Sequence, residues 1–148
     1  MRVTFRGGGS GEERRRVQAL VDELNAALKG QEKSVLTSLA SIANNAWKAK
    51  TKMLDNTTGE AREEMKRVYR HVEGILESLR EMKIEIKDHT GDAFDYGLPL
   101  KVVTTQPTAG ITKEKVIETI KPTVYWHNQI IQMGEVVIAT PAQSQENR

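Results

Sequence analysis

Apolar residues recur every three or four positions through the first third of the chain, which is the spacing of one helix face. Residues 12–54 contain no proline and one glycine, Gly30. Two apolar stripes can be traced here, out of phase with each other. They are Val17, Leu20, Val21, Leu24 and Leu28, then Val35, Leu39, Ile42, Ala46, Ala49 and Met53. The pattern predicts helix, with a kink or break near residues 30–34 that reconciles the stripes.

A second helix is predicted after the turn-forming residues 55–59. Thr57 and Glu60 have the spacing of a capping box, in which side chains at the helix start bind free backbone N–H groups. The apolar positions then step alternately by four and three residues, and they are Ala61, Met65, Val68, Val72, Ile75, Leu79 and Met82. This heptad spacing is typical of a helix that packs lengthwise on other helices, and it also fits one face of a globular core.

The heptad helix needs partners. Burial of seven such side chains contributes roughly 10 to 20 kcal/mol, whereas ordering some 23 residues costs on the order of 35 kcal/mol before backbone hydrogen bonds are counted. A hairpin with the first helix still leaves an apolar side uncovered, and a homodimer that closes a four-helix bundle would cover it. The predicted dimer interface consists of Leu39, Ile42, Met65, Val68, Val72, Ile75 and Leu79.

Beyond Met82 the pattern changes to the alternation and the β-branched clusters of strands. Strands are predicted at residues 84–87, 102–105, 116–120, 123–126 and 136–138. Turn-forming residues separate them at 89–92, 106–110 and 133–134. Pro122 interrupts a strand run and indicates an edge or a bulge there.

These patterns together predict an α+β fold, in which a helical dimerisation region precedes a small all-β domain. The helical region covers residues 12–83 and the β domain residues 84–140. Residues 1–11 are glycine-rich and are predicted to form a flexible tail, because this composition buries no apolar surface. Residues 141–148 are polar and are predicted to be a disordered tail.

Composition narrows the function classes. The 148 residues include no cysteine, which excludes disulfides and thiolate metal sites and suits a reducing cytoplasm. No run of about 20 apolar residues is present, so no membrane partner is expected. The 22 basic and 20 acidic residues are interspersed and only 5% of residues are aromatic, which argues against a nucleic-acid partner.

No catalytic site is predicted. The histidines, which are His71, His89 and His127, lack metal-ligand spacing, so neither a metal nor another cofactor is expected. Asp88, Asp92 and Asp95 could hold Ca²⁺ or act as an acid and base pair. However, aspartates around Gly91 are sufficiently explained as turn formers that bond their own backbone.

Segments of the chain resemble GrpE-type nucleotide exchange factors, the co-chaperones of DnaK-type chaperones. Residues 82–103 resemble the family's entry into its β-domain, with Gly91-Asp92-Ala93-Phe94-Asp95 standing where the family has Gly-Glu-x-Phe-Asp. Residues 116–139 resemble its last hairpin, including Tyr125 and His127. The stretches 39–54 and 61–82 look like the two helices of its dimeric bundle, so that the resemblance spans residues 32–140.

The resemblance implies a homodimer that binds the nucleotide-binding domain of a DnaK-type chaperone and promotes ADP release. It assigns partner contact to five residues, namely Tyr125, His127, Gln129, Gln132 and Met133. The family's Arg-Val-Leu-Arg-Pro appears here with glutamine at both arginine positions, and only residues 12–29 represent its long helical stalk. These departures support a second hypothesis, a diverged homodimeric structural or adaptor module without exchange activity.

Overall fold

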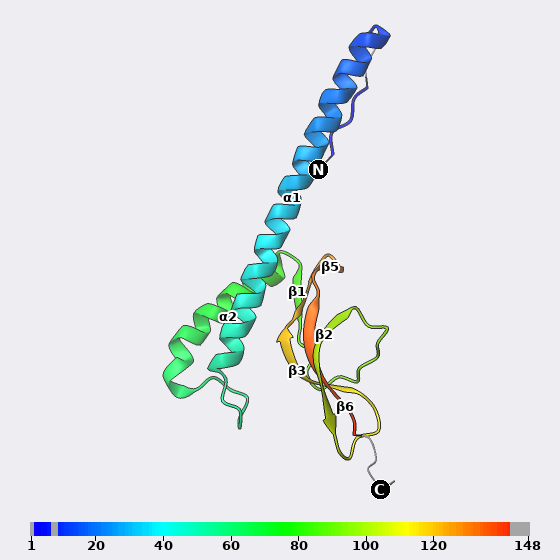
Figure 1. The fold of residues 1–148 in the computed structure, drawn as a ribbon. Helices are drawn as coiled ribbons and strands as arrows, with labels where there is room; N and C mark the ends of the chain where they lie inside the picture. Colours follow the sequence, from blue (N-terminus) through cyan, green and yellow to red (C-terminus); the bar gives the residue numbers. More distant parts are fainter. Residues whose placement is uncertain (1, 7–8, 143–148) are drawn as a thin grey trace. The chain divides into compact units, whose positions relative to one another are not determined.

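A computed structural model describes residues 2–6 and 9–142. The elements in order are α1 (Gly11–Met53), the 3-10 helix η1 (Glu63–Met65), α2 (Lys66–Glu81), β1 (Ile84–Lys87), β2 (Leu100–Thr108), β3 (Lys115–Lys121), β4 (Thr123–Trp126), β5 (Gln129–Gln132) and β6 (Gly134–Pro141) (Figure 1). Helices come first and strands follow, which confirms the predicted α+β class. The remaining residues of the two predicted tails, 1, 7, 8 and 143–148, lie outside the described residues.

The chain divides into two compact units, Met1–Ser38 and Leu39–Arg148. In the first unit the backbone N–H of Val3 donates to Asn25 Oδ1 at 2.7 Å, and Asn25 Nδ2 donates to the carbonyl oxygen of Val3 at 2.9 Å. Val3 therefore departs from the predicted flexible tail, because one amide side chain binds both of its backbone polar groups. The Oγ of Ser10 accepts a hydrogen bond from the N–H of Glu13 at 3.1 Å and caps the start of α1.

The break predicted near residues 30–34 is absent, because α1 is a single helix from Gly11 to Met53. Gly30 is not among the described glycines with positive φ, so its backbone fits a helix. Glycine inside a helix costs only about 1 kcal/mol relative to alanine. Two apolar stripes that are out of phase can therefore lie on one continuous helix.

The connection between α1 and α2 is organised by Asp55. Its carboxylate accepts hydrogen bonds from the backbone N–H groups of Thr57 and Thr58, at 2.7 and 3.2 Å. The predicted capping box of Thr57 and Glu60 is wrong, because Thr57 belongs to this turn and not to a helix start. α2 begins only at Lys66, after a single turn of 3-10 helix.

Within the described residues the strands form two sheets of three strands each. The first has the order β1-β4-β5 and is antiparallel throughout. The second has the order β2-β6-β3, with β2 parallel and β3 antiparallel to β6. Pro122 lies between β3 and β4, where the chain passes from one sheet to the other. The register of β3 shifts between Thr119 and Lys121, which confirms the predicted irregularity beside this proline.

Two strand predictions need correction. β2 continues through residues 106–108, which were predicted as part of a turn, and the chain reverses only near Gly110, whose φ angle is +86°. Proline within this segment is tolerated because β2 is an outer strand. β5 was not predicted, since Gln129-Ile130-Ile131-Gln132 has neither alternation nor a β-branched cluster of the usual length.

Two apolar clusters hold the second unit together. The first combines Ala43 of α1, Leu79 of α2, Ile84 of β1 and Val124 of β4. The second consists of Phe94, Val116, Val136 and Ile138. Because the first cluster joins helices to strands, the predicted boundary between residues 83 and 84 marks a change of secondary structure and not a border between separately packed regions.

Candidate functional site

The β4–β5 hairpin contains most of the residues for which the resemblance implies partner contact. Its turn consists of His127 and Asn128, whose φ angles are +48° and +66°. Positive φ at both central residues is the signature of a type I′ turn, which matches the twist of two antiparallel strands. His127 is therefore held at the hairpin tip, where it is exposed to solvent.

The five predicted contact residues lie in or next to the β4–β5 hairpin, but they do not share one face of the sheet. Tyr125 pairs with Ile130, and Trp126 pairs with Gln129. Neighbouring strand residues point to opposite faces, so Tyr125 and Gln129 lie on opposite sides. Met133 follows the hairpin and is exposed. A partner that contacts all of these residues would have to approach the hairpin tip and edge.

Gln132 is tied to the interior of its own unit. Its side-chain amide donates to the carbonyl oxygen of Pro122 at 3.0 Å, and it lies 3.5 Å from Oδ1 of Asn44, a buried residue of α1. The residue is half-buried. The resemblance implies a partner-binding arginine at this position. In this chain, however, Gln132 links the first sheet to α1.

Two members of the predicted dimer interface, Val68 and Ile75, belong to an exposed apolar stripe that runs along α2 to Met82, the residue after its end. Val68, Ile75 and Met82 are 50%, 45% and 48% exposed, and they follow one another at intervals of seven residues. Ile42 of α1 is exposed to a similar extent. Such regularly spaced apolar residues on a helix surface are typical of a surface that packs against another helix.

Other members of the predicted dimer interface pack within the second unit, which makes them less available to a partner. Leu79 and Val72 are buried, and Leu79 belongs to the first apolar cluster. Leu39 packs against the same cluster, and Met65 is half-buried. The accessible apolar surface is therefore narrower than the heptad pattern predicts, because one side of α2 faces the strands and α1.

A polar network around His89 joins the two sheets. The Nε2 of His89 lies 2.7 Å from Oγ1 of Thr123 in β4, and its backbone N–H donates to Oγ1 of Thr119 in β3 at 3.1 Å. Its Nδ1 lies 3.8 Å from the carboxylate of Asp92. Sequence spacing gave no signal for this network, since Thr119 and Thr123 are 30 and 34 positions away from His89.

A cavity of about 220 Å³ opens beside this network. Its lining includes His89, Asp92, Leu98, Leu100, Thr123 and Tyr125. The imidazole of His89 lies between the carboxylate of Asp92 and the hydroxyl of Thr123, as the histidine of a catalytic triad lies between an aspartate and a nucleophile. Thr123, however, is only 1% exposed, so a substrate cannot reach its hydroxyl. The geometry supports a structural role for the network.

The acidic residues around Gly91 behave as turn formers. The carboxylate of Asp88 accepts a hydrogen bond from the N–H of Thr90, and that of Asp95 from the N–H of Gly97, both at 2.9 Å. This confirms the interpretation of these two residues as groups that bond their neighbouring backbone. Within residues 2–6 and 9–142 no group of three or more histidine, aspartate or glutamate side chains is placed to hold a metal.

No model of a known protein family matches this sequence, and no curated protein matches it significantly. No helix in the described part of the chain combines the length and apolar character that a membrane crossing requires. The features that bear on function are therefore the exposed residues of the hairpin and of α2, together with the resemblance of individual segments.

The fold should lose stability as the pH falls because of His89. Burial, and then the positive charge of Lys87, lower the pKa of His89 from its ordinary value of 6.5, against the opposing charges of Asp92 and Asp88. In the unfolded chain the imidazole takes up its proton at a higher pH than in the fold. The free energy of unfolding should therefore decrease from about pH 6.5 downward, through the folded pKa of His89.

Chemical denaturation at several values between about pH 5 and pH 7 checks this dependence. In His89→Gln, whose amide can still reach Thr123, the part of the slope due to His89 should disappear. His71→Gln alters an exposed histidine of α2 and serves as the matched control. Equal slopes for the wild-type protein and His89→Gln would contradict the expectation.

Proposed function

We propose that the chain is a GrpE-like co-chaperone, a homodimer that binds the nucleotide-binding domain of a DnaK-type chaperone and promotes ADP release. The observation that carries the proposal is the exposed apolar stripe of Val68 and Ile75 on α2 and of Met82 at its C-terminal end, from which the chain leads directly into the β strands. This order of elements agrees with what the resemblance implies. The exposed hairpin tip at His127 supports a partner-binding role for the strands.

The proposed activity involves no chemical step on this chain. Binding of the hairpin region to an open form of the chaperone's nucleotide cleft would shift the chaperone's population toward that form, and ADP would leave faster. His127, Gln129 and Met133 are the exposed contact residues, and Tyr125 is half-buried beside them. The activity needs no enzyme chemistry, cofactor, metal, membrane or nucleic acid, and a cytoplasmic setting suits the cysteine-free sequence.

Release of a fluorescent ADP analogue from a DnaK-type chaperone of the same source, followed by stopped flow, tests the proposal. We expect a saturable increase of the release rate with the concentration of this protein. Met133→Ala should weaken the effect several-fold, because the exposed side chain lies next to the hairpin. Ile117→Ala removes an exposed apolar side chain from β3, in the other sheet, and should leave the rate unchanged.

A second candidate function, a homodimeric structural or adaptor module without exchange activity, is favoured by one observation. Gln132, at a position where the family has an arginine, is engaged by Pro122 and Asn44. The two candidates differ in the outcome of the same measurement. No acceleration at concentrations at which sedimentation shows the dimer would reject exchange activity for that chaperone and leave the adaptor module.

Gln129→Arg is the informative way to restore the family's charge. Gln129 is exposed, so arginine can be introduced without removing an internal hydrogen bond. Gln132→Arg, in contrast, would also remove the bond to Pro122, and a loss of stability would obscure its effect on the partner. An increase in exchange activity for Gln129→Arg would support the hairpin as the contact region.

A further inference from the structure

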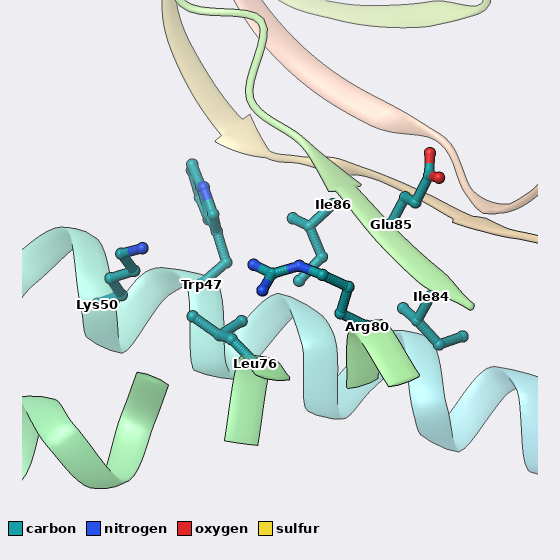
Figure 2. Close-up of a pocket in the computed structure, with 7 residues that line it drawn as sticks. All are labelled: Trp47, Lys50, Leu76, Arg80, Ile84, Glu85 and Ile86. Carbon is teal, nitrogen blue, oxygen red and sulfur yellow. The ribbon is translucent and has the colours of Figure 1, made fainter. Parts of the chain in front are cut away.

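A groove of about 460 Å³ runs beside β1, between α2 and the C-terminal part of α1 (Figure 2). It is lined by Trp47 and Lys50 of α1, Leu76 and Arg80 of α2, and Ile84, Glu85 and Ile86 of β1. Side chains of consecutive strand residues point to opposite faces. A groove that touches three consecutive residues must therefore follow the backbone edge of the strand. That edge is open, because β1 is an outer strand of its sheet.

The backbone polar groups of Ile84 and Ile86 point toward this open edge. The carbonyl oxygen of Lys83 accepts a hydrogen bond from the N–H of His127, so Lys83 faces the hairpin. Backbone groups of an antiparallel strand alternate in direction. Glu85 therefore faces β4, and the residues on either side of it face away. In the part of the chain that the structure describes, these outward groups have no hydrogen-bond partner.

Ile86 is the accessible point of this edge. Ile84 is buried, whereas Ile86 is half-buried. One N–H donor and one C=O acceptor at Ile86 are thus available to a chain laid alongside β1. Outer strands with free backbone groups are a common docking site for extended peptides, which add a strand to the sheet.

The walls of the groove combine an apolar slot with positive charge. Figure 2 shows Trp47, Leu76 and Ile86 around the slot, with the guanidinium of Arg80 turned toward them. The carboxylate of Glu85 points away from it (Figure 2). The charges that face the groove are therefore cationic.

Both cations can accept a new partner. Among the described residues the ammonium of Lys50 has no ion-pair partner, and it lies 6.0 Å from the ring centre of Tyr69. Arg80 pairs with Glu77, but both side chains are more than half exposed. Such surface pairs contribute about 1 kcal/mol or less, so a carboxylate entering the groove can compete with Glu77.

We propose that this groove binds an extended, acidic segment of another protein. The segment pairs its backbone with Ile86, places a bulky apolar side chain in the slot of Trp47 and Leu76, and brings carboxylates to Lys50 and Arg80. The carboxylates lie two positions before and after the apolar residue, because alternate residues of a strand share a face. This inference does not depend on the proposed exchange activity.

Two other occupants fit less well. A second copy of the chain would bring its own Lys50 and Arg80 to the same edge, and like charges in one groove repel each other. Residues 143–148 of this chain contain no apolar side chain that could fill the slot. The charge and shape of the groove favour an acidic partner with one large apolar residue.

Fluorescence anisotropy with a labelled, blocked heptapeptide, Thr-Glu-Thr-Leu-Thr-Glu-Thr, tests the proposal on the full chain. We expect saturable binding below about 1 mM. A peptide with lysine in place of both glutamates should bind at least about tenfold more weakly. No saturable binding of the glutamate peptide in this range would overturn the proposal, as would equal affinity for the two peptides.

Peptides with methylated backbone nitrogens test whether the segment docks as a strand. Alternate N–H groups of an added strand point toward β1 and the others point to solvent. Methylation of one alternating set should abolish binding, whereas methylation of the other set should be tolerated. Equal tolerance of both sets would overturn strand addition at Ile86.

Lys50→Glu should weaken binding of the glutamate peptide at least about tenfold and should strengthen binding of the lysine peptide. Lys52→Glu is the matched control, because it changes the same charge in the last turn of α1 without lining the groove. Unfolded variants are excluded by circular dichroism. If peptide affinity instead falls as the protein concentration rises, a second copy occupies the groove and the proposed partner is wrong.

Discussion

Replacement of Ile84 by alanine should lower the free energy of unfolding by about 3 kcal/mol. Ile84 is 2% exposed and lies in one apolar cluster with Ala43, Leu79 and Val124. Alanine removes three carbon atoms from the centre of this cluster, and the surrounding helices and strands can fill the cavity only in part. The loss should appear as one cooperative transition, because the cluster joins both kinds of element.

Urea denaturation checks this, followed by far-ultraviolet circular dichroism for the helices and by tryptophan fluorescence for the environment of Trp47 and Trp126. The protein concentration must be held constant, since formation of a dimer would add to the apparent stability. Ile117→Ala serves as the control, because Ile117 is 38% exposed and its loss should cost less than about 1 kcal/mol. Two separate transitions, of which Ile84→Ala shifts only one, would show that helices and strands pack independently.

The outcome bears on how far local sequence patterns describe this protein. Period-two alternation correctly placed β1, and the cluster of Thr123-Val124-Tyr125-Trp126 correctly placed β4. The alternation of β1 arises because Ile84 and Ile86 lie on its covered face, whereas β4 is marked by β-branched residues, since both Thr123 and Val124 are buried. β5 has no such pattern, since Gln129 is exposed while Ile131 and Gln132 both meet the rest of the unit.

Helix predictions failed where the outcome depended on neighbours in space. The heptad positions of α2 were correct as apolar positions, yet Leu79 faces the strands while Ile75 faces solvent. Spacing along one helix cannot show which partner covers each side. Thr57 is likewise a residue type that often caps helices, but its N–H donates to the carboxylate of Asp55 within a turn. Competition between two local structures is decided by geometry that the sequence pattern does not contain.

The candidate site shows the same limit. The hairpin residues were predicted as partner contacts because Tyr125 and His127 resemble a family motif, and the structure places both residues in the β4–β5 hairpin. The inward bonds of Gln132 depend on Pro122 and on Asn44, which is 88 residues away along the chain. The groove at Ile86 depends on the strand order, which leaves β1 at an edge. Both features arise from tertiary contacts alone.

Gly134 is the second position at which a substitution should have a large effect, because Gly134→Ala should lower the free energy of unfolding by about 2 kcal/mol. A Cβ at this position would lie 2.5 Å from Oγ1 of Thr123, 2.9 Å from Cδ2 of Leu100 and 3.2 Å from the backbone nitrogen of Thr123. Leu100 can move its side chain, but Thr123 cannot move freely, since its hydroxyl is held by His89. The backbone of β4 or β6 must therefore shift.

Gly74→Ala is the matched control for this prediction. Gly74 lies in α2, has no positive φ angle, and an added Cβ would meet nothing within 4 Å. Alanine there should raise the free energy of unfolding by about 0.5 to 1 kcal/mol, because it restricts the unfolded chain and favours helix. Opposite changes from the same substitution, measured by chemical denaturation, would establish the close approach of the two sheets at Thr123. Equal stability of Gly134→Ala and the wild-type protein would contradict the prediction, because it would mean that Thr123 and Leu100 leave room for a Cβ at this position.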